Sequence, residues 1–241
     1  MTVMRAGQRI VNIPGIGMNI PRRAVSAAGA VSWWLAGGVS AANAIGVYQP
    51  KGAASLAASY SNLANPGTYD AAPGTAPAWA AGTGWQFVRG LATYLTTGVE
   101  FASPVKPTVI VRYSDFVPWW ASFLGGQEPG GAAWNKIANV GMTASARYAS
   151  LVVTPIGATA EPGASGVLAV AGGYGYLDGV VNTALMTQLD RPTAEIYIGS
   201  HKTTAGAAAD PITANFQAVA IYNTTLSGPQ VAAVSAAMAL L

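Results

Sequence analysis

Nine acidic residues and one histidine are the side chains that could support acid–base chemistry in this 241-residue chain. The acids are Asp70, Glu100, Asp115, Glu128, Glu161, Asp178, Asp190, Glu195 and Asp210. No two of them are closer than five residues, so no strand carries the i, i+2 pair that places two carboxyls on one face for retaining hydrolysis. His201 follows Gly199-Ser200 in a predicted turn, and we expect it to be exposed to solvent. The sequence therefore predicts no catalytic residue and no enzyme.

The same inventory of side chains argues against metals and cofactors. There is no cysteine, which excludes a disulfide scaffold and a thiolate metal site. Calcium takes six to eight oxygen ligands, and the sparse acids predict no strong site for it. Phosphate-loop and dinucleotide fingerprints are absent from the sequence, so we expect no cofactor. Asp178 lies in the segment Tyr-Leu-Asp-Gly (176–179), where Asp-Gly predicts a hairpin turn rather than a ligand set.

Aromatic residues are the candidates for contacts with a ligand or a second subunit. Those singled out are Trp119, Trp120, Trp134, Tyr174 and Tyr176. In a strand, neighbouring residues point to opposite faces, so at most one of Trp119 and Trp120 belongs to the core. The other would cover a ligand groove or a subunit contact, and the same reasoning applies to Trp33-Trp34. For each single tryptophan, packing in the core is the alternative.

Charges are few and unevenly placed. Charged residues make up 9% of the chain, against about 25% in soluble domains, while 51% of the residues are hydrophobic, which excludes a disordered chain. Residues 1–69 carry five basic residues and no acid. We predict that residues 1–30 form an extended basic arm that anchors the protein to a partner through Arg5, Arg9, Arg22 and Arg23. A presequence, a nucleic-acid arm and packing on the chain's own domain are the alternatives.

The composition also argues against two further partners, nucleic acid and a membrane. Four arginines spread among Ile, Val, Gly and Pro are too sparse for a nucleic-acid arm, so we expect no nucleic-acid partner. The uncharged stretch 24–50 is long enough to cross a bilayer, but its Ala, Gly, Ser and Asn residues contribute little transfer energy. We therefore expect no membrane span, and interpret the stretch as a buried strand or the loop leading into one.

Short apolar runs separated by turn signals predict an all-β sandwich or barrel. These runs are 45–48, 85–88, 93–96, 108–113, 148–154, 166–171, 194–198 and 215–222. One helix is predicted over 227–240, because Ser227 and Gln230 form a capping box and Leu226 and Val231 a hydrophobic staple. The helix has no charged residue, so we expect it to be packed on the sandwich or on a neighbouring chain.

Four segments in order resemble laminin-G-like domains of the concanavalin A-like lectin/glucanase superfamily. They are GWQFVRGLATYLTTGV (84–99), GVLAVAGGYGYLDGVV (166–181), IYIGS (196–200) and FQAVAIYNTTLSGPQVAAVSAAM (216–238). The resemblance implies a jelly-roll sandwich of two antiparallel sheets over residues 31–241, following the arm 1–30. Residues 33–60 also resemble versions of this domain carried by bacteriophage and prophage structural proteins.

Two functions follow from these observations. The main prediction is a non-enzymatic structural protein of a phage virion, a capsid decoration, head-fibre or tail-associated subunit attached through the arm. Its partners would be other virion proteins and copies of itself in a homo-oligomer, with a trimer as the first candidate, and its location the virion. The alternative is a carbohydrate-binding or adhesion module that recognises a cell-surface glycan. Fold alone does not decide between them.

Overall fold

The computed structural model describes nine stretches of the chain, all within one compact unit that spans Val31–Leu241. They are residues 32–101, 105–118, 121–126, 139–141, 147–149, 156–157, 162–182, 195–203 and 205–241. The four arginines of the predicted arm, Arg5, Arg9, Arg22 and Arg23, lie outside them. The arm therefore stays a prediction.

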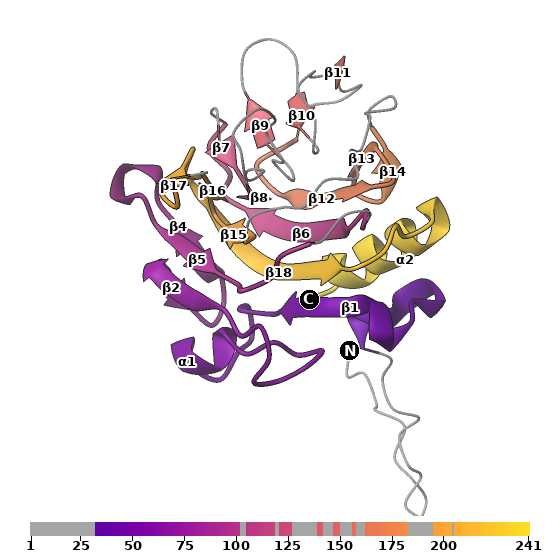
Figure 1. Cartoon of the computed structure of the whole chain (residues 1–241), viewed down its shortest axis with the longest axis horizontal. Coiled ribbons are helices and arrows are strands. Elements are labelled where there is room, and N and C mark those ends of the chain that lie inside the picture. The colour runs from indigo at the N-terminus through magenta and orange to yellow at the C-terminus, as the bar shows by residue number, and fades with distance from the viewer. Residues whose placement is uncertain are drawn as a thin grey trace, which may run out of the picture. The chain divides into compact units, whose positions relative to one another are not determined.

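An eight-stranded antiparallel sheet, sheet A, forms the centre of this unit (Figure 1). Its strands run in the order β14 (Val180–Val181), β13 (Tyr174–Leu177), β12 (Gly166–Ala171), β6 (Thr108–Ser114), β18 (Ala214–Tyr222), β4 (Gly84–Phe87) and β3 (Ala78–Ala80). The eighth strand, β1 (Ala44–Tyr48), pairs with the second half of β18. Seven of the predicted runs overlap strands of this sheet or of sheet B, described next, which confirms the all-β prediction for them.

Three smaller antiparallel sheets accompany sheet A. Sheet B contains β2 (Ala72–Thr75), β5 (Tyr94–Thr96), β15 (Tyr197–Ile198) and β8 (Leu124–Gly125). Sheet C contains β11 (Ile156–Gly157), β10 (Arg147–Ala149), β9 (Asn139–Gly141) and β7 (Ala121–Ser122), and the last sheet contains β16 (His201–Lys202) and β17 (Ala208–Ala209). The described helices are η1 (Trp33–Gly38), η2 (Ala41–Asn43), α1 (Leu56–Ser59), η3 (Arg89–Leu91) and α2 (Gly228–Ala239).

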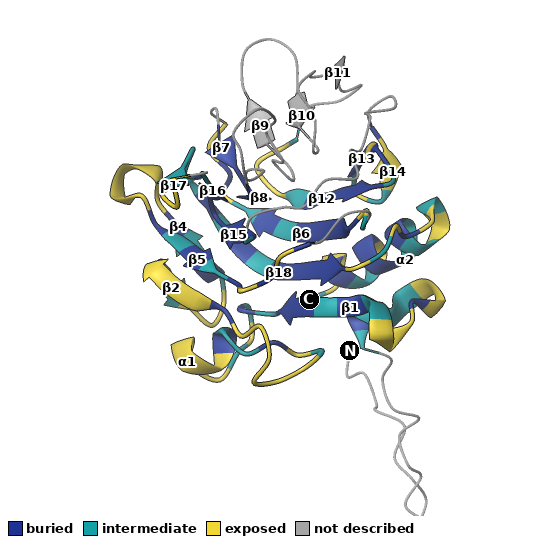
Figure 2. Cartoon of the chain, in the orientation of Figure 1, coloured by how far each residue is buried: buried dark blue, intermediate teal, exposed yellow. Residues whose placement is uncertain are grey.

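Sheet A is buried on both faces, so its central strands are nearly continuous apolar runs rather than alternating ones. In β6, Val109 and Val111 pack in the core that includes Leu95 and Ile198 of sheet B. Ile110, between them, faces the opposite side and belongs to a second core beneath α2 and η1. Figure 2 shows β6 and β18 as the buried centre of the sheet. The result is three layers, of sheet B, sheet A and the α2 side, and the predicted antiparallel sandwich is confirmed.

Helix α2 begins as the sequence predicts. The Ser227 hydroxyl accepts a hydrogen bond from the Gln230 backbone, and the Gln230 side chain accepts one from the Ser227 backbone, which completes the capping box. Val231, Val234 and Met238 are fully buried against sheet A. The apolar stripe thus packs on the chain's own sandwich, the first of the two partners expected for it.

The prediction for Trp33-Trp34 is wrong, because these residues form a 3-10 helix rather than a strand. Their rings meet edge to face with centroids 5.4 Å apart, and both pack in the core beneath α2. The Trp33 indole donates to Gln49, and the Trp34 carbonyl accepts from the Tyr222 hydroxyl. In a tight helical turn, adjacent side chains are not forced to opposite faces as they are in a strand.

Candidate ligand-binding site

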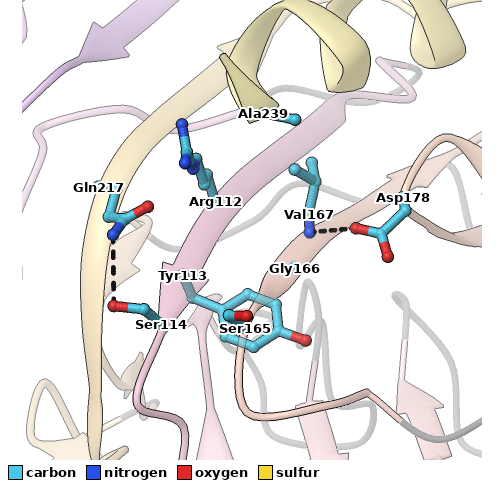
Figure 3. A pocket seen from close by; sticks show the side chains of 9 residues that line it. All are labelled: Arg112, Tyr113, Ser114, Ser165, Gly166, Val167, Asp178, Gln217 and Ala239. Atoms are coloured by element: carbon cyan, nitrogen blue, oxygen red, sulfur yellow. Dashed lines mark hydrogen bonds between the residues drawn. The ribbon is translucent and has the colours of Figure 1, made fainter. Parts of the chain in front are cut away.

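A polar pocket of about 330 Å³ lies on the face of sheet A that carries α2, at the C-terminal end of that helix (Figure 3). Its lining comes from β6, β12, β18, the β13–β14 turn and the end of α2: Arg112, Tyr113, Ser114, Ser165, Gly166, Val167, Asp178, Gln217 and Ala239. The volume lies at the lower end of the range for small-ligand sites, about 300–1,000 Å³. The polar side chains gather here because α2 ends and no longer covers the sheet.

Arg112 lies on the α2 side of β6, two residues after the buried Ile110. The apolar core beneath α2 ends there and the pocket begins. The Nη1 of Arg112 donates to the main-chain oxygens of Met238 and, at 2.7 Å, Leu241, which belong to the last turn of α2 and the residues after it. A cation at a helix C-terminus is favourable because the unpaired carbonyls carry partial negative charge. Burial lowers the pKa of Arg112 from its ordinary value. Its Nε and Nη2 make no hydrogen bond to the described residues.

Gln217 reaches the pocket because β18 bulges at this point. Phe216 pairs with Tyr113 and Ala218 pairs with Arg112, so Gln217 is an extra residue without a partner in the register. Bulges of this kind redirect a side chain and are common beside functional sites. The Gln217 amide nitrogen lies 3.3 Å from the Ser114 hydroxyl and donates to it, while no described residue bonds its amide oxygen.

Asp178 forms the opposite wall from a two-residue hairpin turn between β13 and β14. It has a left-handed backbone, with φ of 51°, and Gly179 follows with φ of 81°, as a type I′ turn requires. One carboxylate oxygen accepts from the Val167 backbone at 2.8 Å. The predicted turn-forming role of Asp178 is therefore confirmed. The second oxygen points away from Val167 in Figure 3 and has no partner among the described residues.

The absence of a side chain at Gly166 shapes the pocket. A Cβ atom there would lie 3.1 Å from the Asp178 carboxylate and 3.2 Å from the Tyr113 hydroxyl. These contacts are tighter than ordinary van der Waals packing, so a larger residue would displace the polar groups. Together the pocket presents unused guanidinium donors, an amide oxygen, a carboxylate oxygen and the exposed Ser165 hydroxyl. Such a set suits a small ligand with several hydroxyl groups.

The expectation that His201 is exposed is wrong: the residue is completely buried. It begins β16, whose pairing with β17 and packing beside β8 enclose the ring. The Ser122 hydroxyl lies 3.1 Å from His201 Nδ1, and an Asp210 carboxylate oxygen lies 3.6 Å from the same atom. A Ser-His-Asp hydrolase needs the serine and the acid on opposite ring nitrogens. Because both contacts converge on Nδ1, this arrangement is not a catalytic triad.

Of the predicted aromatic site residues the structure describes Tyr174 and Tyr176, and neither lines the pocket. Trp119, Trp120 and Trp134 lie outside the described residues. Tyr174 is 36% exposed on β13 but does not line the pocket. Tyr176, on the same strand, is buried in the core beneath α2. The predicted ligand role of Tyr174 and of the three tryptophans stays a prediction.

Sequence reasoning missed Arg112 and Gln217. Arg112 gave a signal, because it is the one charge inside the apolar run of β6. Gln217 gave none, since a bulge depends on how two strands pair and not on the residues of one strand.

No protein-family model matches the sequence, and no curated protein matches it either. Several solved structures do match the chain. Domain 4 of AbnA, a GH43 extracellular arabinanase from Geobacillus stearothermophilus solved in complex with arabinotriose, is 17% identical with a TM-score of 0.55; the match covers 80% of this chain and 98% of that one. The sandwich fold is shared with this domain.

A sialidase from Trypanosoma rangeli also matches, at 14% identity and a TM-score of 0.54. The match covers 81% of this chain but 32% of the sialidase, so this chain spans about a third of that protein's length. These neighbours support the β-sandwich fold that the sequence resemblance implied. Identities this low establish the fold and not the activity.

Two features are absent from the described residues. None of the helices there has the length and apolar character needed to cross a membrane. The same residues contain no group of three His, Cys, Asp or Glu side chains that could hold a metal ion.

Proposed function

We propose that this chain is a carbohydrate-binding module that holds a glycan in the pocket between Arg112, Gln217 and Asp178. The observation that carries the proposal is the hydrogen-bonding capacity there that the described residues leave unused. Arg112 offers two guanidinium nitrogens, Gln217 an amide oxygen and Asp178 a carboxylate oxygen, all facing one depression. Sugars present neighbouring hydroxyls that both donate and accept, so a mixed set of donors and acceptors matches them.

The structural neighbours support the same proposal at the level of fold. Domain 4 of the arabinanase, which this chain matches over 98% of its length, was solved with arabinotriose. The shared sandwich is therefore compatible with a glycan site. The position of the site comes from the pocket in this chain and not from that likeness.

Binding is favoured over hydrolysis by the number of carboxylates. Among the described residues Asp178 is the one acid that lines the pocket, whereas retaining hydrolysis uses two carboxyls about 5 Å apart. The nearest acid in the bonding network, Asp115, accepts from Asn215 at 2.6 Å and from Ser114 at 3.2 Å, outside the lining. We accordingly propose a module without catalytic activity.

The test is a glycan array with the full chain, followed by calorimetric titration of the best glycan. Gln217→Ala and Ser165→Phe should each weaken binding about tenfold or more, by removing a hydrogen-bonding group and by filling the pocket. The matched controls are Gln86→Ala on β4 and Ser40→Phe at the exposed residue before η2, whose side chain caps no helix; both should bind like the unmodified chain. If no glycan binds, or if the pocket variants bind as well as their controls, the proposal is wrong.

The role in a phage virion depends on residues 1–30, outside the described part of the chain, and no comparison supports it. It stays a prediction, as do the homo-oligomer and the virion partners. Deleting residues 2–30 would test it directly. If the shortened chain has the same oligomeric state and assembly as the full chain, the arm is not an anchor.

A further inference from the structure

The described lining of the pocket carries one charge of each sign, on opposite walls (Figure 3). Arg112 lies at the end of α2, and Asp178 lies in the β13–β14 turn. The two side chains differ in the groups to which they are hydrogen-bonded, and this difference indicates which kind of glycan the pocket accepts. The inference below rests on the proposed function.

The positive charge of Arg112 is already compensated by the protein. Its Nη1 donates to the oxygens of Met238 and Leu241, at the end of α2 where the helix dipole places partial negative charge. Lys51 also donates to the Leu241 oxygen, at 2.7 Å, so two cations share this helix end. A ligand anion at Arg112 would gain a cation but would also approach the negative end of a helix dipole.

Asp178, in contrast, forms no ion pair with a described cation. Its bonded oxygen accepts from a neutral backbone N–H, that of Val167, and its second oxygen has no described partner. A second acid, Asp115, is connected to the pocket through the Ser114 hydroxyl. A ligand carboxylate in the pocket would therefore face a carboxylate of the wall, and like charges at short range repel.

We infer that the pocket selects neutral sugars with adjacent free hydroxyls and rejects glycans that carry a carboxylate at the bound position. In this arrangement the Arg112 Nε and Nη2 groups donate to sugar oxygens, while the free oxygens of Gln217 and Asp178 accept from sugar hydroxyls. Asp178 acts as the specificity-determining residue, because its carboxylate accepts from a hydroxyl but repels another carboxylate.

The decisive variant is Asp178→Asn, which removes the charge and keeps the shape. Asparagine retains an oxygen that accepts from the Val167 backbone, and it tolerates the left-handed conformation that φ of 51° requires. The matched control is Glu100→Gln, which removes one exposed carboxylate from a loop outside the pocket lining.

The experiment titrates neutral glycans and their uronic-acid counterparts of equal length, at low and high salt. For the unmodified chain we expect the neutral glycan to bind about tenfold more tightly or better, with little dependence on salt. Asp178→Asn should strengthen binding of the uronic acid about tenfold and change binding of the neutral glycan much less. Glu100→Gln should change neither.

The outcomes separate the two proposals. If the unmodified chain prefers the uronic acid, or if Asp178→Asn leaves the preference unchanged, the inference about charge is wrong while glycan binding stands. If neither kind of glycan binds to the unmodified chain, glycan binding itself is wrong and the inference fails with it.

Discussion

Replacing Asn62 by alanine should destabilise the protein strongly, although Asn62 lies in an irregular loop. Its side chain is fully buried and makes four hydrogen bonds. The amide oxygen accepts from Val47 N at 2.9 Å and Ala64 N at 3.1 Å, and the amide nitrogen donates to Ile45 O at 2.7 Å and Thr68 O at 2.8 Å. Two of these partners belong to the outer edge of β1, so the side chain bonds that edge much as a neighbouring strand would.

The magnitude follows from these bonds. Each contributes about 1 kcal/mol net, so that four give about 4 kcal/mol. Water that enters the vacated space restores part of this, and we expect Asn62→Ala to lower the free energy of unfolding by about 3 kcal/mol. For a domain of this size each kcal/mol corresponds to about 2–4 °C in Tm, so the expected loss is roughly 6–12 °C.

The assay is differential scanning calorimetry, with Asn223→Ala as the matched control. Asn223 is exposed, and exposed substitutions usually change stability by about 0.5 kcal/mol or less. The reasoning is refuted if Asn62→Ala melts within about 2 °C of Asn223→Ala, because the four bonds would then contribute almost nothing.

Two further predictions concern packing and pH. Gly199→Ala should prevent stable folding, because a Cβ there would lie 2.3 Å from the buried Phe87 ring at a backbone φ of 81°, while Gly90→Ala, with nothing within 4 Å, should melt like the unmodified chain. Thermal melts that place the two alanine variants together would contradict this. Burial raises the pKa of Tyr48 and Tyr222 above the ordinary value of about 10. The folded state therefore favours the neutral phenols. The stability that they contribute is complete below about pH 10 and is lost as the pH rises through their folded-state pKa values. The test measures the free energy of unfolding from neutral to alkaline pH. Above about pH 10 it should fall less steeply in the double variant Tyr48→Phe/Tyr222→Phe than in the unmodified chain. Equal slopes would contradict the argument.

The sequence could predict those structural features that depend on short stretches of chain. The capping box of Ser227 and Gln230 and the Asp178-Gly179 turn are set by neighbouring residues, and both appear in the structure as predicted. His201 shows the limit of such reasoning. Its immediate neighbours suggest an exposed turn, but the strand of Ser122, far away in the sequence, covers it.

The pocket could not be predicted for the same reason. Its walls come from β6, β12, β18 and the β13–β14 turn, and it exists because α2 ends where it does. The bulge that brings Gln217 beside Arg112 depends on the register between two strands. Nothing in a single strand's residues encodes that register, so the residues could be recognised as polar but not as neighbours.

The left-handed backbone at Asp178 restricts how the pocket can be re-engineered. A residue at this position must adopt a positive φ, accept a hydrogen bond from the Val167 backbone and line the pocket, all at once. Asparagine meets these demands, and glycine meets the first, but β-branched and bulky residues meet none without strain. A library that randomises Asp178 should therefore be enriched in aspartate, asparagine and glycine after selection for stability. Ser165, which is exposed and has no such backbone demand, is the position at which to vary ligand preference.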